Sequence, residues 1–431
     1  MNILIKNGRI IDPKNNIDAK QDLYIAAGQI VGIGKAPPTF SVNQTIDASG
    51  LIVAPGFVDL CARLREPGDE YKATLASELR AAAAGGVTSL SCPPDTDPVL
   101  DEPGLVEMLK LRAWRYNLAR IYPLGALTQK LEGKTLTEMC ELTEAGCAGF
   151  TQADHPIVDT QILWRALEYA ATFGYTVFLR PEEPFLAKDG VAHDGEVAGR
   201  LGLKGIPSAA EALRVAAVLR IAQETKAKIH FCRISTAEGV ALIRAAKKNG
   251  VSITADVSIH HLHLTEHDIG YFNTNAHLKP PLRTQRDKDA LCLGVVDGTI
   301  DAICSDHAPV DEDAKLLPFA LAEAGATGLE LLLPLTLKWS ANSKAPLSKA
   351  VAKITSEPAA ILGIQSGNLS VGAHADIAIF DPEAAWQVTP NMLMSQGKNT
   401  PFINMELTGK VMYTLLNGEV TYQSTYQSNV Q

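Results

Sequence analysis

The chain has 431 residues, of which 46% are hydrophobic and 20% are charged, as is typical of a folded globular protein. This length exceeds that of one small domain and suits a barrel of roughly 250 residues with a smaller additional module. The net charge of −9 at pH 7, without a cluster of Lys and Arg, argues against a nucleic-acid partner.

The N-terminal stretch does not have the pattern of an export signal. MNILIKNGRIIDP is interrupted by polar residues, Gly and Pro before an apolar core of signal-peptide length develops. No run reaches the roughly 18 apolar residues of a membrane span. The seven cysteines include no C-x-x-C pair and fit neither a disulfide framework nor a zinc ribbon. We therefore expect a cytoplasmic protein with no membrane partner.

The first 54 residues are predicted to form short strands separated by turns. The strand-like runs are NILIKNGRIID, DLYIAAGQIVGIG and SVNQTIDASGLIVAP, with Asn-Gly and Ala-Gly steps between or within them. The stretch from residue 364 to the end has the same character, in ADIAIFDP, WQVTP and GKVMYTLLNGEVTY. Two β segments therefore bracket the middle of the chain.

Between residues 55 and 363, β-rich runs alternate with helical stretches. GVTSLSCPP precedes PGLVEMLKLRAWRYN, YTVFLRP precedes SAAEALRVAAVLRIAQET, and IHFCRIS precedes TAEGVALIRAAKKNG. Repeated strand and helix units indicate an α/β protein with a parallel sheet, and a segment of this length fits a (β/α)₈ TIM-type barrel. Capping-box spacing predicts two helix starts, at Ser208 with Glu211 and at Ser235 with Glu238.

The active site of such a barrel lies at the carboxyl ends of its strands. The residues that end the predicted strands are dense in charge and would face one shared pocket. They are Asp59, Cys61, Arg63, Arg65, Pro94, Asp95, Thr96, Thr151, Gln152, Arg180, Glu182, His230, Arg233, Asp306 and His307.

Several long motifs resemble the dihydroorotase branch of the amidohydrolase superfamily. They are PGFVDLCARLREPG, CPPDT, LRPEE, VAHDGEVAGRLGLKGIPSAAEA, KIHFCRISTAEG, LKPPLR, DGTIDAICSDHAP and VGAHADIAIFDP. The resemblance covers nearly the whole chain in the expected order. It implies a barrel over residues 55–363 and a smaller β-sandwich domain formed by residues 1–54 and 364–431.

The resemblance also implies where a metal site would lie. Active relatives hold one or two zinc ions, which turn water into hydroxide, through an H-x-H pair, a carboxylate or carboxylated lysine, two further histidines and an aspartate. Only His230 and Asp306 match retained ligands, so we expect no bound zinc and keep these two as residual candidates. The other ligand positions are degenerate and fall on Cys61, Arg63, Gln152 and Arg180.

The positions that hold dihydroorotate in the family are altered in the same way. Arg65 matches a family arginine, but Asp95, Lys279 and Val310 stand where the family has asparagine, asparagine and histidine. A carboxylate at 95 would oppose an anionic substrate. Arg65 and Asp95 therefore mark only a remnant of the substrate site, and Asp306 is the one residual catalytic candidate.

The arginines suggest what replaces the metal. A guanidinium opposes a nearby dication, and it can give two parallel hydrogen bonds to a carboxylate. We expect Arg63 or Arg180 to pair with Asp306 in the barrel mouth, with Glu182 as a further carboxylate partner. The sequence does not fix the orientation of either arginine.

Other histidines and Cys61 are assigned no chemistry. The segment HHLHLTEH matches a stretch without a ligand role in the family, and His307 is interpreted as structural. Nothing in the sequence lowers the pKa of Cys61 except the neighbouring arginines.

Three functions follow from this pattern. The first is a non-catalytic dihydroorotase-like protein of pyrimidine biosynthesis, which the resemblance implies is an oligomer-forming structural partner of aspartate carbamoyltransferase. The second is a cyclic amidohydrolase with an altered single-metal site built from Cys61, His230 and Asp306. The third is a module that binds an anion between Arg63, Arg65 and Arg180.

Overall fold

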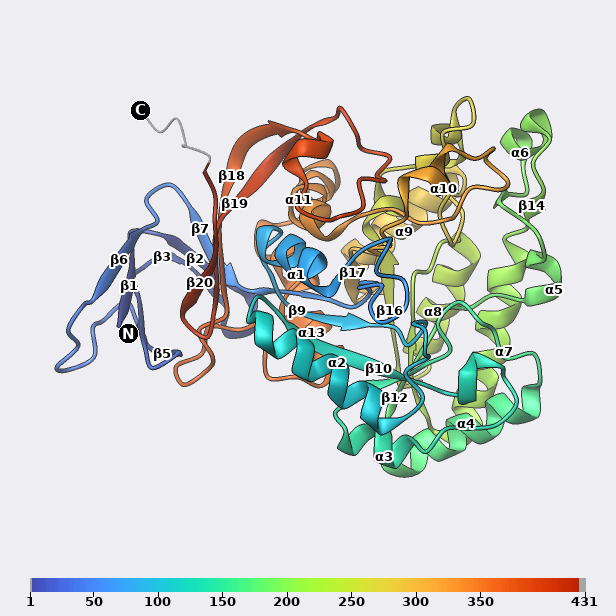
Figure 1. Ribbon diagram of the computed structural model, residues 1–431, viewed down its shortest axis with the longest axis horizontal. Coiled ribbons are helices and arrows are strands. Elements are labelled where there is room, and N and C mark those ends of the chain that lie inside the picture. Colours follow the sequence, from blue (N-terminus) through green and yellow to red (C-terminus); the bar gives the residue numbers. More distant parts are fainter. Residues whose placement is uncertain (1, 426–431) are drawn as a thin grey trace.

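The computed structural model describes residues 2–425 and contains a barrel and a β domain beside it (Figure 1). The barrel is built from the middle of the chain, and the first and last described segments, coloured blue and red, form the β domain. The expected α/β class with a second β-sheet domain from both termini is confirmed. No helix in the described residues is both long and apolar enough to cross a membrane.

The barrel sheet contains eight strands in the order β17-β16-β15-β12-β11-β10-β9-β8. All neighbouring strands are parallel, and burial along them is nearly continuous because helices cover the outside. The strands are β8 (Phe57–Asp59), β9 (Val87–Cys92), β10 (Arg120–Ala126), β11 (Gly149–Thr151), β12 (Thr176–Leu179), β15 (Lys228–Phe231), β16 (Ile253–Ser258) and β17 (Ala302–Cys304).

The segments that follow β8 and β17 close the barrel. Ala62 and His307 form a parallel bridge, and the Arg63 amide donates a hydrogen bond of 2.8 Å to the His307 carbonyl. Asp59 at the end of β8 is fully buried and accepts hydrogen bonds from the amide and hydroxyl of Ser305 at 2.7 and 2.5 Å. These contacts bring the first and last strand ends, which carry Arg63 and Asp306, to one mouth.

Helices surround this sheet and separate its strands along the chain. A short pair, β13 (Ala192–His193) and β14 (Gly205–Ile206), extends from the mouth. The helices are α1 (Leu75–Ala84), α2 (Pro103–Tyr116), α3 (Met139–Glu144), α4 (Thr160–Phe173), α5 (Pro184–Ala187), α6 (Glu196–Leu201), α7 (Ala209–Thr225), α8 (Ala237–Lys248), α9 (Gln285–Asp297), α10 (Glu312–Leu316), α11 (Leu332–Ser343), α12 (Leu347–Lys353) and α13 (Ser356–Leu362).

The β domain contains two sheets. A four-stranded sheet has the order β5-β4-β1-β6, and a six-stranded sheet has the order β20-β19-β18-β7-β2-β3. The strands are β1 (Ile3–Lys6), β2 (Arg9–Asp12), β3 (Ile17–Lys20), β4 (Leu23–Ala26), β5 (Gln29–Ile33), β6 (Gln44–Asp47), β7 (Ile52–Pro55), β18 (Ile377–Gln387), β19 (Glu406–Leu416) and β20 (Glu419–Gln423).

The six-stranded sheet is apolar on both faces. Val53 and Ile377 pack toward the four-stranded sheet, whereas Ile52, Ala54 and Ala378 belong to the core shared with the barrel. Successive side chains of a strand point to opposite faces of the sheet. Alternate residues of β7 and β18 therefore pack against the four-stranded sheet on one face and against the barrel on the other. The boundaries expected at residues 54 and 364 stay a prediction.

The two predicted capping boxes are wrong, although α7 and α8 form where expected. Ser208 makes no side-chain cap, and α8 is capped by Thr236 rather than Ser235. Glu211 instead crosses to the next βα unit and accepts hydrogen bonds of 2.6 to 2.9 Å from the amides and hydroxyls of Ser235 and Thr236. Four hydrogen bonds to the buried carboxylate of Glu211 stabilise the fold more than a local cap of α7 would. The role of Glu211 is therefore set by a tertiary contact and not by its place in its own helix.

This arrangement predicts that Glu211→Gln lowers the free energy of unfolding by at least about 2 kcal/mol, because the amide group of glutamine places a donor against donors. Urea unfolding followed by circular dichroism measures the change. Glu238→Gln is the matched control, since Glu238 only pairs with exposed Arg286 and should change stability by less than about 0.5 kcal/mol. The reverse ranking would contradict the assignment.

Candidate functional site

Three buried arginines line the barrel mouth. Arg63, Arg180 and Arg233 follow β8, β12 and β15, and their side chains are only 7%, 3% and 4% exposed. Strand ends of a parallel barrel converge on one face, which explains why residues so distant in sequence meet. Three permanent positive charges in this small volume require carboxylates close by.

Asp154 supplies the central negative charge. It follows β11, and its two oxygens accept hydrogen bonds from Arg180 Nε at 2.5 Å, Arg233 Nη2 at 2.6 Å and Arg63 Nη2 at 2.7 Å. Burial alone would raise the pKa of Asp154, but the guanidiniums of Arg233, Arg63 and Arg180 outweigh burial and hold the pKa well below its usual value. Asp154 therefore stays ionised at every physiological pH.

Two of the arginines have a further carboxylate each. Arg63 Nε donates to Asp95 at 2.9 Å, and Arg180 gives Glu182 two parallel bonds of 2.7 Å. Glu182 was expected as a carboxylate partner, and this expectation is confirmed. Asp95 stands where the resemblance implies an asparagine, and a carboxylate there would repel an anionic substrate. In this structure the carboxylate of Asp95 is instead the ion-pair partner of Arg63.

The expected pairing of Arg63 or Arg180 with Asp306 is wrong. Arg233 is the partner, through Nη1 at 3.1 Å from Asp306 Oδ1, while Arg63 and Arg180 turn to Asp154. Burial raises the pKa of Asp306, and the opposing effects of Arg233 and Arg63 do not cancel this increase. Asp306 is thus less fully ionised than Asp154, although the two share Arg233.

Backbone conformation explains why the sequence pattern missed Asp154 and the pairing of Arg233 with Asp306. Ala153, Arg233 and Asp306 have positive φ values of 49°, 53° and 48°. Such left-handed conformations are costly for residues other than glycine, and they change the direction of the side chains relative to strand alternation. Charge balance gave no signal either, because the predicted strand ends carry four arginines and four carboxylates.

The other two positions expected to be degenerate, Gln152 and Cys61, make no hydrogen bond to the three arginines. Gln152 exchanges hydrogen bonds of 2.8 and 3.1 Å with Thr128 and makes none to the arginines. Cys61 Sγ lies 3.9 Å from Asp306 Oδ1, and burial raises the pKa of its thiol far above the usual value. Cys61 is therefore a neutral thiol and a poor nucleophile or metal ligand.

His230 does not join Asp306 and Cys61. Its Nδ1 and Nε2 lie 2.8 Å from Thr254 and 2.9 Å from Asp256. Within residues 2–425, the one group of three donors near enough to hold an ion combines His230, Cys232 and Asp256, with ligand atoms within 4.8 Å of one another. The expected alternative set of Cys61, His230 and Asp306 is not brought together.

Neither arrangement fits a resident zinc ion. Both ring nitrogens of His230 are already bonded, Asp256 also accepts from the Arg233 amide at 2.6 Å, and burial raises the pKa of the Cys232 thiol well above normal. At the mouth itself, a guanidinium about 5 Å from a dication costs about 6 to 7 kcal/mol at an effective dielectric constant near 20. Three guanidiniums would oppose an ion there.

The other residues at substrate positions are engaged by the protein. Arg65 Nε donates to the Pro309 carbonyl at 2.9 Å, and its Nη2 lies 3.6 Å from Glu323. Val310 is buried, with its amide bonded to Asn399. The arginines 63, 65 and 180 therefore all have protein partners, which leaves them poorly available to a bound anion.

Within the HHLHLTEH segment, His260 and His261 are buried and His263 is half-buried, and all three are neutral. Burial lowers the pKa of His260 to about 3 and those of His261 and His263 to about 4. His307 lies with Nε2 2.6 Å from Glu78 and accepts the Gly328 amide at Nδ1. His307 joins the barrel to the segment before α11, as its structural interpretation predicts.

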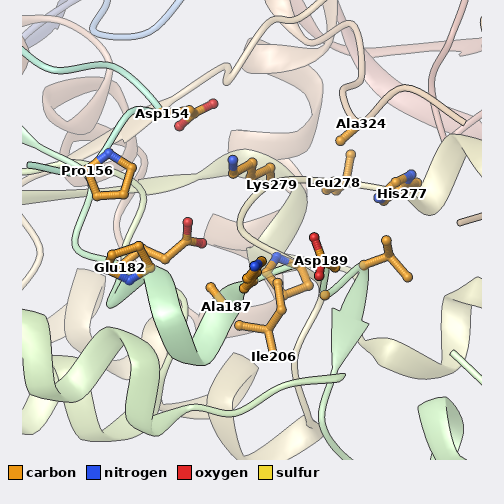
Figure 2. A pocket seen from close by; sticks show the side chains of 15 residues that line it. Asp154, Pro156, Glu182, Ala187, Asp189, Ile206, His277, Leu278, Lys279 and Ala324 are labelled. Carbon is orange, nitrogen blue, oxygen red and sulfur yellow. The ribbon is translucent and has the colours of Figure 1, made fainter. Parts of the chain in front are cut away.

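Two cavities open at the mouth. One of about 160 Å³ lies over the arginine network and touches Arg65, Asp95 and Asp306. The other, of about 270 Å³, lies between α5 and the segment 277–281, with Asp154, Glu182 and Lys279 on its wall (Figure 2). Both are small compared with the roughly 300 to 1,000 Å³ of typical small-molecule sites.

The chain belongs to the amidohydrolase family, whose sequence model matches residues 194–421. Within that family it is dihydroorotase-like, since the model described as dihydro-orotase-like matches residues 50–239. It is 42% identical to a dihydroorotase-like protein of Pseudomonas aeruginosa, over 98% of this chain and 100% of the relative. A dihydroorotase of Geobacter sp. is 41% identical over the same shares.

Solved structures share the fold at much lower identity. L-hydantoinase from Arthrobacter aurescens superimposes with a TM-score of 0.86 over 97% of this chain and 95% of its own, at 22% identity. D-hydantoinase from Thermus sp. gives a TM-score of 0.84 at 22% identity, covering 98% and 96% of the two chains. These similarities support the barrel and its β domain.

Asp154 and Asp306 should respond differently to the same isosteric change. Asp154→Asn should lower the free energy of unfolding by about 3 to 5 kcal/mol, because it leaves three buried guanidiniums without their shared anion. Asp306→Asn should cost far less, because burial already disfavours its charge. Urea unfolding at pH 7 measures both, with exposed Glu132→Gln as control. Equal losses would refute the central role of Asp154.

The same pair predicts opposite pH effects. Asp154 has a folded-state pKa below the unfolded value of about 3.9, so its stabilisation is complete above about pH 5 and is lost only as pH falls through the folded pKa. Asp306 has a raised pKa, so the cost of its ionisation disappears as pH falls. The stability difference between wild type and Asp154→Asn should therefore persist at pH 5.

Proposed function

We propose that this dihydroorotase-like protein is catalytically inactive and acts as a structural partner of aspartate carbamoyltransferase in pyrimidine biosynthesis. The observation that carries the first half is the network of Arg63, Arg180 and Arg233 around Asp154. It fills the barrel mouth with fixed, matched charges, where active relatives would bind zinc.

Hydrolysis of a cyclic amide requires a group that can activate water. Without a metal, that group would be a carboxylate or histidine with a free acceptor and access to the mouth. Asp95, Asp154, Glu182 and Asp306 are all bonded to guanidiniums. The guanidiniums lower the pKa of Asp154 and of Glu182, which weakens these two carboxylates as proton acceptors. The engagement of these carboxylates by guanidiniums supports the proposal that the mouth does not activate water.

The scaffold that supports a binding role is nevertheless complete. The barrel is closed and the apolar core is continuous from the barrel to the six-stranded sheet. The partner itself is inferred from the family resemblance. An inactive barrel with an intact surface fits a protein whose contribution is to hold another enzyme in its assembled form.

Exposed apolar side chains at the mouth support a protein partner. Phe185 on α5, Tyr271 after β16, and Leu316 and Leu321 after β17 are 73%, 92%, 76% and 70% exposed. All three loops leave carboxyl ends of barrel strands, so the side chains surround the same face. Solvent exposure of several large apolar groups on one face is typical of an interaction surface.

We expect no dihydroorotase turnover above buffer, with or without added zinc, because the ligand set cannot generate hydroxide. A steady-state assay of dihydroorotate formation and hydrolysis tests this, and Arg63→His alone should not restore activity, since ligands act as a unit. Turnover, or near-stoichiometric zinc that is lost in His230→Asn, would instead favour an amidohydrolase whose single metal is held by His230, Cys232 and Asp256 rather than by the expected set of Cys61, His230 and Asp306.

The assembly proposal predicts co-purification with the aspartate carbamoyltransferase of the same organism. Replacing Tyr271, Leu316 and Leu321 together by Ser should weaken that complex at least about tenfold, because it removes apolar contact area without touching the core. Size-exclusion chromatography with light scattering measures assembly. Exposed Leu111 and Trp114 on α2 provide the matched control, as their replacement by Ser should leave assembly unchanged.

A further inference from the structure

A cavity of about 190 Å³ lies where the β domain meets the barrel. Its walls come from α11, from β18, β19 and β20, and from the segment that joins β18 to β19. Figure 1 shows α11 beside β18 and β19. Among the residues that the structure describes, those that line this cavity line neither of the two cavities at the mouth. It is therefore a separate site, which we call the junction cavity.

Large apolar side chains line much of the junction cavity, namely those of Leu333, Pro334, Trp386, Met392, Met394 and Val411. The indole N–H of Trp386 donates a hydrogen bond of 3.0 Å to the Gly409 carbonyl, which fixes the ring. Met392 and Met394 are 42% and 51% exposed, and thioether side chains adapt readily to different ligand shapes. The cavity therefore combines a fixed aromatic ring with an adaptable, solvent-exposed edge.

Glu330 supplies the only carboxylate among the described residues of the lining. Its two oxygens accept hydrogen bonds from the amides of Met394 at 2.7 Å and Ser395 at 3.1 Å. In the described part of the chain it forms no ion pair, and the ammonium group of Lys410 lies instead over the Trp386 ring, 5.7 Å from its centroid. A carboxylate that lines a cavity without a cationic partner gives that cavity a negative potential.

The segment that holds Glu330 is itself fixed. Ser395 donates its hydroxyl hydrogen to Glu78 at 2.7 Å, and the Gln396 amide donates to the same carboxylate at 3.0 Å. Glu78 belongs to α1 and is fully buried. The position of the Glu330 carboxylate is therefore set before any ligand binds, which lowers the entropic cost of binding.

We propose that the junction cavity binds a small primary amine with an apolar body, whose ammonium group pairs with Glu330. The class of ligand follows from the lining, because Glu330 lacks a positive partner and the apolar side chains are stabilised by contact with an apolar group. One carboxylate is too few for a divalent cation, and its charge disfavours an anion. A volume below the roughly 300 Å³ of typical small-molecule sites limits the body to one ring or a short chain. The proposal does not depend on catalysis at the mouth or on the partner protein.

The ionisation of Glu330 agrees with this assignment. Burial raises its pKa to about 7, and the hydrogen bonds from two amides and the attraction of His307 do not offset burial, while Glu78 raises the pKa further. Tyr422 on β20 also lines the cavity, and the charge of Glu330 contributes to the raised pKa of this tyrosine. An ammonium group beside Glu330 would favour its ionised form, and an aromatic side chain nearby suits an organic cation.

Isothermal titration calorimetry of the full chain with 2-phenylethylamine at pH 8 tests the site. We expect saturable binding with a Kd below about 5 mM. The anion 3-phenylpropionate should not bind, and uncharged 2-phenylethanol should bind at least about tenfold more weakly than the amine. At pH 6 the amine should also bind about tenfold more weakly, because Glu330 is then mostly protonated while the amine keeps its charge.

Two substitutions in the cavity test the same pairing. Glu330→Gln removes the charge and should weaken binding of the amine at least about tenfold. Met392→Lys places a competing ammonium group at the exposed edge of the cavity and should have the same effect, which keeps the test decisive if Glu330→Gln does not fold. Met405→Lys is the matched control, because Met405 is 36% exposed and lies outside the lining, so binding should be unchanged.

Thermal melts verify that each variant is folded. The proposal is overturned if the amine does not bind saturably, or if the alcohol or the anion binds as tightly as the amine. It is equally overturned if the folded Glu330→Gln or Met392→Lys variant binds as well as wild type, or if Met405→Lys weakens binding as much as Met392→Lys.

Discussion

The ionised carboxylate of Asp154 is the interaction on which the barrel mouth depends. Three guanidiniums converge on it from β8, β12 and β15, and each would be strongly destabilising without a nearby anion. Asp95, Glu182 and Asp306 complete the balance at the edges of the network. The mouth of this barrel is therefore held together by fixed charges of opposite sign.

The network is possible because the fold supplies both rigidity and exclusion of water. The bridge between Ala62 and His307 fixes the two ends of the barrel sheet, and buried Asp59 and Glu78 tie those ends to Ser305 and His307. Left-handed backbone conformations at Arg233 and Asp306 then aim two side chains into the mouth. Such conformations persist only where the surrounding structure determines them strongly, as it does here.

The two arginines at expected ligand positions each form an ion pair with a carboxylate of the barrel mouth. Arg63 meets Asp95, and Arg180 meets Glu182, so each positive charge introduced at a ligand position has a carboxylate that suits it. This compatibility supports a scaffold that is stable without catalysis, as proposed.

The sequence by itself determined the barrel, the β domain from both termini and the family, because periodicity, turn residues and long motifs are local properties. The loss of ligands at Cys61, Arg63, Gln152 and Arg180 stays a prediction from the resemblance. Tertiary structure alone decided which charges meet. Asp154 replaced Asp306 as the main partner of Arg63 and Arg180, and Glu211 left its own helix to bind Ser235 and Thr236. Ion pairing depends on distances of a few ångströms between separate strand ends, and strained backbone at those ends sets the distances, which no local pattern encodes.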